Sequence, residues 1–148
     1  MAKQLRRDIR ALLLAPSSDL AVQVDDRLRR LGFPSLRPAQ TQLLTLVEAG
    51  GKRLTDLVDS MHLPKQTLGD MVDELERQKL VERYPDPDHG VIKRVRLAAR
   101  GRAWAQEVHK VAEATEARWS AALGKSKLKT LRGLLEELGV SLNGVSKD

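Results

Sequence analysis

The sequence predicts a mainly helical α+β fold in which a pair of short helices is followed by a small β-hairpin. Apolar residues recur at helical spacing in LTDLVDSM and again in PKQTLGDMVDELERQK. The turn-forming residues of PDPDHG then separate LVERY from VIKRVRL, where apolar and basic residues alternate as in a strand. This order over residues 54–101 is that of a winged helix-turn-helix, which places one helix in the DNA major groove and the hairpin, the wing, beside it.

Two helices are expected in the first 32 residues. The apolar positions of the first are Leu5, Ile9, Leu12 and Leu13, and those of the second are Leu20, Val24, Leu28 and Leu31. Pro16 is expected to end the first helix, because proline lacks the backbone N–H that a helix interior needs. Asp19 is a suitable N-cap for the second helix, and Gly32 is a suitable stop.

The central helices begin and end at similar signals. Pro38 fits the first turn of a helix that Gly50 and Gly51 close, Thr55 is a plausible N-cap for the next helix, and Pro64 fits the first position of the helix after it. That last helix, over residues 64–79, is the candidate recognition helix. Its expected buried face consists of Leu68, Met71, Val72 and Leu75.

Beyond the hairpin, a long helix is expected over residues 100–123. Gly124 is expected to break it, Ser126 to cap a final helix, and Gly139 to end that helix. The outer helices carry apolar stripes that need a partner surface, and a second copy of the chain is the simplest one. We expect residues 1–33 and 100–148 to contribute dimerisation helices around a DNA-binding domain at residues 34–99, in one compact folding unit. The expected dimer-interface residues are Leu5, Ile9, Leu12, Trp119, Leu128, Leu131 and Leu135.

Composition favours an anionic partner. The 148 residues carry a formal net charge of +6 and contain no cysteine, which excludes disulfides and thiolate metal sites. No apolar stretch approaches the roughly 20 residues of a membrane span. The apolar run at residues 11–15 is shorter than the roughly 7–15 residues of a signal-peptide core. We therefore expect a cytoplasmic, nucleoid-associated protein of bacterial type.

No pattern in the sequence indicates an enzyme, and we expect no cofactor, no metal site and no catalytic residue. The three histidines fall in separate elements without metal-ligand spacing. Asp86 and Asp88 cluster with His89, but the turn-forming role of Asp and Pro explains this cluster better than a metal site does.

The candidate DNA-reading residues are Lys65, Gln66, Thr67 and Asp70 on the recognition helix. Gln66 can pair bidentately with adenine, and Thr67 can touch a thymine methyl. Lys65 can contact phosphate or guanine, whereas Asp70 repels phosphate unless it accepts a hydrogen bond from cytosine N4. The alternative is that these are ordinary solvent-facing helix residues.

The candidate phosphate-contacting residues of the wing are Lys93, Arg94 and Arg96, part of a run of five basic residues up to Arg102 that contains no acidic one. As an alternative, Arg83 and Arg94 pair with nearby carboxylates instead of DNA. Trp104, close to the end of the wing, is a weak candidate for a ligand pocket and is more simply explained as core or dimer interface.

Residues 36–101 resemble the MarR family of bacterial winged helix-turn-helix regulators. The matching segments are LRPAQTQLLTLV, RLTDLVDSMHLPKQTLGDMVDELERQKLVERYPDPD and RLAARGRA, and the most specific is DELERQKLVER at residues 73–83. The order of the outer helices also fits. The resemblance implies an obligate homodimer, a triangular α+β subunit, and a transcription factor that small molecules often release from DNA.

The sequence departs from the family pattern at two places. His89 and Gly90 stand where the family usually has Asp-Arg at the wing tip, and glycine cannot supply the charge that favours a narrow minor groove. Gly69 and Asp70 stand where Ser or Thr and a basic residue are common.

We therefore predict a dimeric, sequence-specific transcriptional regulator, a repressor relieved by a small-molecule effector. Two alternatives stay open: a degenerate winged-helix module that binds proteins, and a non-specific architectural DNA binder.

Overall fold

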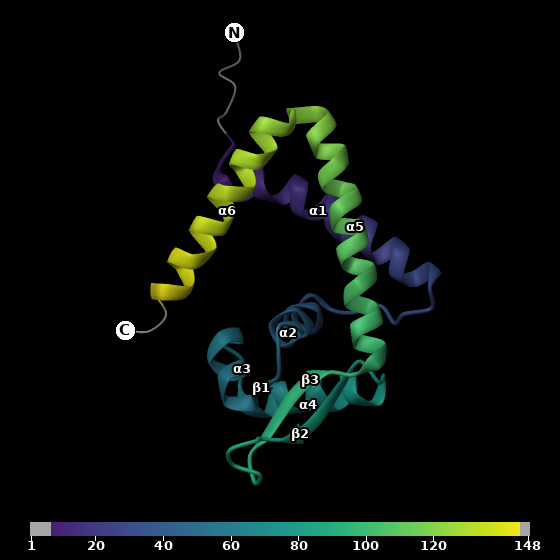
Figure 1. The fold of residues 1–148 in the computed structure, drawn as a ribbon, viewed down its shortest axis with the longest axis vertical. Helices are drawn as coiled ribbons and strands as arrows, with labels where there is room; N and C mark the ends of the chain where they lie inside the picture. Colours follow the sequence, from purple (N-terminus) through teal and green to yellow (C-terminus); the bar gives the residue numbers. More distant parts are fainter. Residues whose placement is uncertain (1–6, 146–148) are drawn as a thin grey trace.

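The computed structural model describes residues 7–145, which form six helices and three strands and confirm the predicted mainly helical fold (Figure 1). The helices are α1 (Ile9–Arg30), α2 (Pro38–Glu48), α3 (Leu54–Met61), α4 (Lys65–Arg77), α5 (Ala99–Leu123) and α6 (Lys125–Val145), and the strands are β1 (Lys52–Arg53), β2 (Val81–Pro85) and β3 (Lys93–Leu97). In Figure 1, α5 rises from the sheet to a sharp turn, α6 returns from that turn, and α1 crosses α5. No helix within residues 7–145 is both long and apolar enough to span a membrane.

The wing is a three-stranded antiparallel sheet rather than the two-stranded hairpin that we predicted. Strands β2 and β3 pair from Val81 with Leu97 to Pro85 with Lys93. Strand β1 adds Lys52 and Arg53 to the other edge of β3, so the strand order is β1-β3-β2. Because β1 is only two residues long, it carries no alternation by which it could be recognised in the sequence.

The core lies where α2, α3 and α4 pack against the sheet and the first turns of α5. Its fully buried side chains include Leu43, Leu44, Leu57, Leu68, Val72, Leu75, Leu80, Val81 and Trp104. The predicted inner face of α4 is confirmed, since all four of its apolar positions are buried. Each buried leucine stabilises the fold by roughly 1.5–3 kcal/mol relative to an exposed one. The core therefore fixes the orientation of α4.

Gly101 allows α5 to start directly against the segment that follows α4. A Cβ atom at this position would lie 1.9 Å from the Leu80 carbonyl oxygen. The same oxygen accepts a hydrogen bond from the Ala98 N–H at 3.0 Å. The first turn of α5 is therefore in backbone contact with the residue that follows α4 and precedes β2.

The prediction of two N-terminal helices is wrong, because α1 is continuous and Pro16 lies inside it. Residues 7–18 are all exposed in the single subunit, so no other element of the chain encloses the Leu12 carbonyl that Pro16 leaves unpaired, which lowers the cost of leaving it without a partner. Asp8 caps α1 by accepting from the Ala11 N–H at 3.0 Å. Asp19 instead accepts from Trp119 and Arg118 on α5, each at 2.9 Å.

Four further helix boundaries differ from the prediction. Thr55 is the second residue of α3, and Pro64 precedes the first residue of α4 as its N-cap. Gly124, with φ of 87°, ends α5 as predicted, but α6 begins at the next residue, so Ser126 lies inside it. Gly139 also lies inside α6, where glycine costs only about 1 kcal/mol relative to alanine.

Candidate nucleic-acid interface

Helices α3 and α4 form the helix-turn-helix. Helix α3 ends at Met61, and the left-handed backbone of the next residue, His62 (φ 53°, ψ 36°), turns the chain. Pro64 then holds φ at −57°, and α4 starts with Lys65. The turn is therefore short and fixed by its own backbone conformation.

The predicted DNA-reading residues all lie on the exposed side of α4. Lys65, Gln66, Thr67 and Asp70 are exposed, whereas the opposite face of the helix is buried. The Gln66 Nε2 donates to Asp70 Oδ1 at 3.0 Å, which joins two of them one turn apart. This contact leaves the Gln66 carbonyl oxygen as the outward acceptor of that side chain.

Arginines from other elements neutralise the remaining acidic residues of α4. Arg37, the N-cap of α2, pairs with Glu74 at 2.6 Å. Arg83 on β2 pairs with Asp73 at 2.7 Å and with Glu76 at 2.6 Å. These pairs offset negative charge that would otherwise repel phosphate along the recognition helix. The alternative prediction that Arg83 pairs with carboxylates is confirmed.

The three basic residues predicted for the wing have different surroundings. Lys93 is exposed at the start of β3, opposite Pro85. Arg96 is exposed and pairs with Glu82 at 2.7 Å, with its guanidinium 4.4 Å above the Tyr84 ring. Lys93 and Arg96 are therefore available at the surface, the latter held in place by its neighbours on β2.

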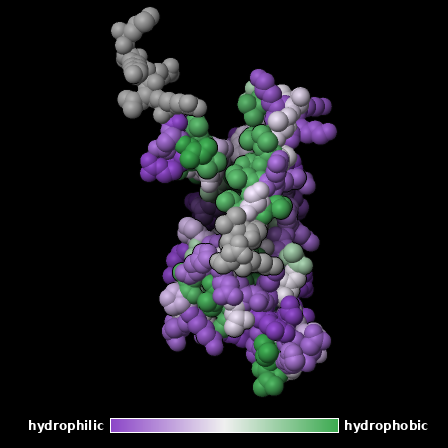
Figure 2. Space-filling model, turned by 90° about the vertical axis from the view of Figure 1, so that its left-hand side faces the viewer, coloured by the Kyte–Doolittle hydropathy of each residue, from purple (hydrophilic) through white to green (hydrophobic). Residues whose placement is uncertain are grey.

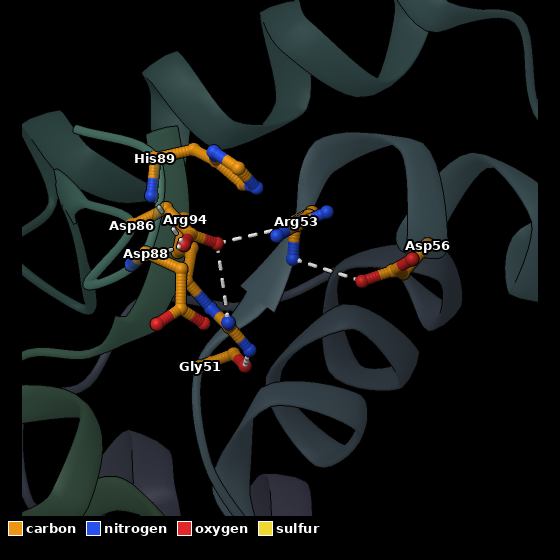
Figure 3. Close-up of polar contacts among 7 residues, drawn as sticks. All are labelled: Gly51, Arg53, Asp56, Asp86, Asp88, His89 and Arg94. Atoms are coloured by element: carbon orange, nitrogen blue, oxygen red, sulfur yellow. Dashed lines mark hydrogen bonds and ion pairs between the residues drawn. The ribbon is translucent and has the colours of Figure 1, made fainter. Parts of the chain in front are cut away.

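Arg94, in contrast, is partly buried in an ion-pair network around Asp86, as the alternative prediction for it expected (Figure 3). The Asp86 side chain is fully buried and accepts from Arg53 at 2.9 Å and from Arg94 at 3.3 Å. The other oxygen of Asp86 accepts from the backbone N–H groups of Asp88 at 2.9 Å and His89 at 3.1 Å. Asp86 therefore connects the turn of the wing to β1 and β3.

This network also ties the wing to the helix-turn-helix. Arg53 lies on β1 and is the N-cap residue of α3, and its backbone N–H donates to Asp56 at 3.2 Å. Arg94 donates to the Gly51 carbonyl oxygen at 2.7 Å. The Arg53 guanidinium, together with the backbone N–H groups, holds the pKa of Asp86 well below its usual range.

Sequence reasoning found the turn at Asp86 but missed its partner, Arg53. The carboxylate does accept turn hydrogen bonds, as Asp residues in turns commonly do. Arg53 lies 33 residues earlier in the chain, and β1, which brings it close, was not predicted.

The wing tip carries no arginine. His89, Gly90 and Val91 are all exposed, and 96% of Val91 is accessible. Within residues 7–145, no group of three His, Cys, Asp or Glu residues is placed to hold a metal ion.

A family model and solved structures match this chain. Residues 35–90 match the model of the MarR family. A transcriptional regulator from Thermotoga maritima is 26% identical, with a TM-score of 0.63, over 94% of this chain and 97% of that one. A structure described as MarR is 21% identical, with a TM-score of 0.70, over 92% of this chain and 98% of that one.

A mutant MarR from E. coli, solved in complex with operator DNA, has the same fold. It is 21% identical, with a TM-score of 0.61, over 86% of this chain and 90% of that one. No match was found among curated proteins.

Proposed function

The chain belongs to the MarR family of winged helix-turn-helix transcriptional regulators, a class of DNA-binding proteins that are not enzymes, and from this premise we propose that it is a homodimeric, sequence-specific repressor. Its two α4 helices enter successive major grooves of a pseudo-palindromic operator. A small-molecule effector that changes the separation of these helices relieves repression. Residues 34–99 contact DNA, and residues 1–33 and 100–148 form the dimer.

The exposed polar side of α4 is the observation that carries this proposal. Gln66 and Thr67 contact base edges, and Asp70 accepts from a base amino group. Lys65, at the start of the helix, contacts guanine or phosphate. Because buried leucines hold the other side of α4, these side chains are presented on a fixed support.

The wing contributes charge rather than base readout. Lys93 and Arg96 contact phosphates beside the major groove. Arg94 acts in this proposal through Asp86, by holding the wing in place, because its guanidinium is engaged within the chain.

Homodimer formation is supported by the exposed apolar side chains of α1 and α6. Among the predicted interface residues, Ile9 is 67% exposed, Leu12 54% and Leu135 49% in the single subunit, and Leu131 is also exposed. Leu128 and Trp119 are half-buried, and the Trp119 indole N–H donates to Asp19 of its own chain. Leu5 lies outside the described residues. Figure 2 shows apolar side chains gathered where these helices lie. Such a surface needs a partner, and the chain's own copy supplies one with matching character.

Replacing Leu135 with aspartate is expected to convert the dimer to monomer. A charge buried in the interface costs about 2 kcal/mol or more per subunit, so the dissociation constant rises roughly a thousandfold. Analytical ultracentrifugation measures this change. Val91→Asp is the matched control, since it introduces the same charge at an exposed apolar residue far from α1 and α6. Equal dissociation constants for wild type and Leu135→Asp would contradict the proposed interface.

The effector site is supported by a cavity of about 230 Å³ between α1, α2 and α5. Its lining includes Leu28 of α1, Phe33, and Trp104 of α5. The Trp104 indole N–H is buried and has no hydrogen-bond partner within the described part of the chain. A ligand seated there lies between a dimerisation helix and the DNA-binding core. Screening small molecules for release of bound operator tests this part of the proposal.

The experiment that tests the proposal as a whole is selection of bound fragments from a random DNA library at physiological salt with excess competitor DNA. A recovered pseudo-palindrome, with half-sites about one helical turn apart, supports it. Binding without a recovered sequence would favour an architectural protein, and loss of binding in competitor would favour a protein-interaction module.

Alanine at Gln66 and alanine at Lys93 are expected to affect DNA binding differently. Gln66→Ala removes a base contact, so discrimination at one position falls by about 1–3 kcal/mol while non-specific binding stays the same. Lys93→Ala removes a phosphate contact, so all sequences bind more weakly and the slope of log K against log salt decreases by about 1. Titration of selected and scrambled DNA at several salt concentrations separates these outcomes. Identical effects of both variants on both DNAs would contradict the division of roles.

A further inference from the structure

Gly69 is half-buried on the polar side of α4, between Lys65 and Asp73, although the fold does not require glycine there. A Cβ atom at this position would have no neighbour within 4 Å. At Gly51 and Gly101 a Cβ atom would instead meet Tyr84 and Leu80 at less than 2 Å. Internal packing therefore explains those two glycines but not Gly69. Since glycine is less favourable than alanine in a helix interior, this choice weakens the helix without an internal benefit.

Polar side chains surround the bare helix surface at Gly69. Lys65 lies one turn before it and Asp73 one turn after, and all three line a shallow depression. Gln66 and Asp70, joined by their hydrogen bond, also line this depression, as does Leu54 of α3. Apart from Leu54, the side chains around the bare backbone of Gly69 are therefore donors and acceptors.

We propose that Gly69 determines operator sequence by admitting a thymine to the surface of α4, with the C5 methyl group in the space that a Cβ atom would fill. This inference rests on the proposed function. Among the base-pair edges of the major groove, thymine alone presents a methyl group. The position is continuous with the α4 surface that reads DNA, so the base arrives there as the helix enters the groove.

The Asp70 carboxylate beside Gly69 determines which base lies next to this thymine in the operator. Asp70 accepts hydrogen bonds and donates none, so it pairs with the amino group of cytosine or adenine and is repelled by the O6 and N7 acceptors of guanine. The Gln66 amide already donates to Asp70, which holds the carboxylate beside the depression. Each half-site therefore contains a thymine next to a position at which adenine or cytosine, rather than guanine or thymine, faces Asp70.

The test compares Gly69→Ala with wild type in thermal unfolding and in binding to the selected operator. Alanine is expected to raise the melting temperature by roughly 4 °C, because it favours the helix and meets nothing. Operator affinity is expected to fall about tenfold or more, because the new methyl group collides with the thymine methyl. Affinity for non-specific DNA stays unchanged.

Replacing one thymine per half-site by deoxyuridine identifies the thymine whose methyl group lies against Gly69. Loss of the contacted methyl lowers wild-type affinity about fourfold per half-site, whereas in Gly69→Ala it restores part of the lost affinity. Thr45→Ala, which improves helix propensity at an exposed position of α2, is the control and leaves operator affinity unchanged.

The outcomes separate the inference from the function on which it rests. If a pseudo-palindrome is selected and Gly69→Ala binds it as wild type does, the role of Gly69 is wrong and the regulator proposal stands. A lower melting temperature of Gly69→Ala would also overturn the inference, because the site would not be open. If no sequence is selected at all, the proposed function itself fails.

Discussion

Replacing Gly101 with alanine is expected to lower the free energy of unfolding by about 3 kcal/mol. The added methyl group would lie 1.9 Å from the Leu80 carbonyl oxygen, which belongs to the backbone and cannot rotate away. That oxygen is also bound by the Ala98 N–H, so moving it breaks a hydrogen bond. Relief requires a shift of α5 away from the core. Urea unfolding followed by circular dichroism measures the loss.

Gly90→Ala is the control for Gly101→Ala, because a Cβ atom at Gly90 would meet nothing within 4 Å. Its unfolding midpoint is expected to equal that of wild type. An unchanged midpoint for Gly101→Ala would mean that α5 can move away from Leu80 without cost. The close backbone contact between them would then not stabilise the fold.

Replacing Asp86 with alanine is expected to reduce operator affinity about thirtyfold, while the protein remains folded and dimeric. The change leaves Arg53 and Arg94 facing one another without their shared carboxylate. It also removes the acceptor for the turn N–H groups that shape the wing. A wing released in this way no longer holds Lys93 and Arg96 where the proposed function has them contact phosphate, and phosphate contacts supply a large share of affinity for DNA.

Asp88→Ala is the matched control, since Asp88 is exposed in the same turn and joins the network by a hydrogen bond from its backbone N–H, which alanine keeps. Its operator affinity is expected to match wild type. If both variants bound DNA as wild type does, the wing would not depend on the buried carboxylate.

The wing is also expected to resist acid. The charged Asp86 is favoured in the folded state, mainly by its hydrogen bond with Arg53, so its pKa is lower than in the unfolded chain. The stabilisation is therefore complete above the ordinary aspartate pKa of about 3.9 and disappears only as the pH falls further, towards the lowered value. Amide hydrogen exchange at His89 should stay protected at pH 4, and loss of protection above that pH would contradict this ordering.

The sequence predicted the structure best where the spacing of apolar residues and the residue types at helix ends and turns indicate the same element. The buried face of α4, the helix-turn-helix and the hairpin all follow from apolar spacing and from the turn residues of PDPDHG. The exposure of Lys65, Gln66, Thr67 and Asp70 followed from the same spacing, because it assigns them to the side opposite the core.

Predictions from single residues were wrong or incomplete where the tertiary surroundings determine the local structure. Pro16 is normally a helix breaker, but solvent around α1 tolerates the unpaired carbonyl. Gly139 similarly continues α6 despite its low helix propensity. The burial of Asp86 could not be predicted, because it depends on Arg53 from a two-residue strand whose pairing is set by the tertiary fold.

The uninterrupted length of α5 has a mechanical consequence. Its 25 residues span about 37 Å, with the turn into α6 at one end and the wing at the other (Figure 1). As a stiff lever arm of that length, it turns a tilt of about 5° at Gly124 into a displacement of about 3 Å at its far end. That displacement is close to the rise of one base pair, about 3.4 Å. In the proposed dimer on DNA, small angular adjustments between the two subunits are thereby amplified into displacements of about one base-pair step along the double helix.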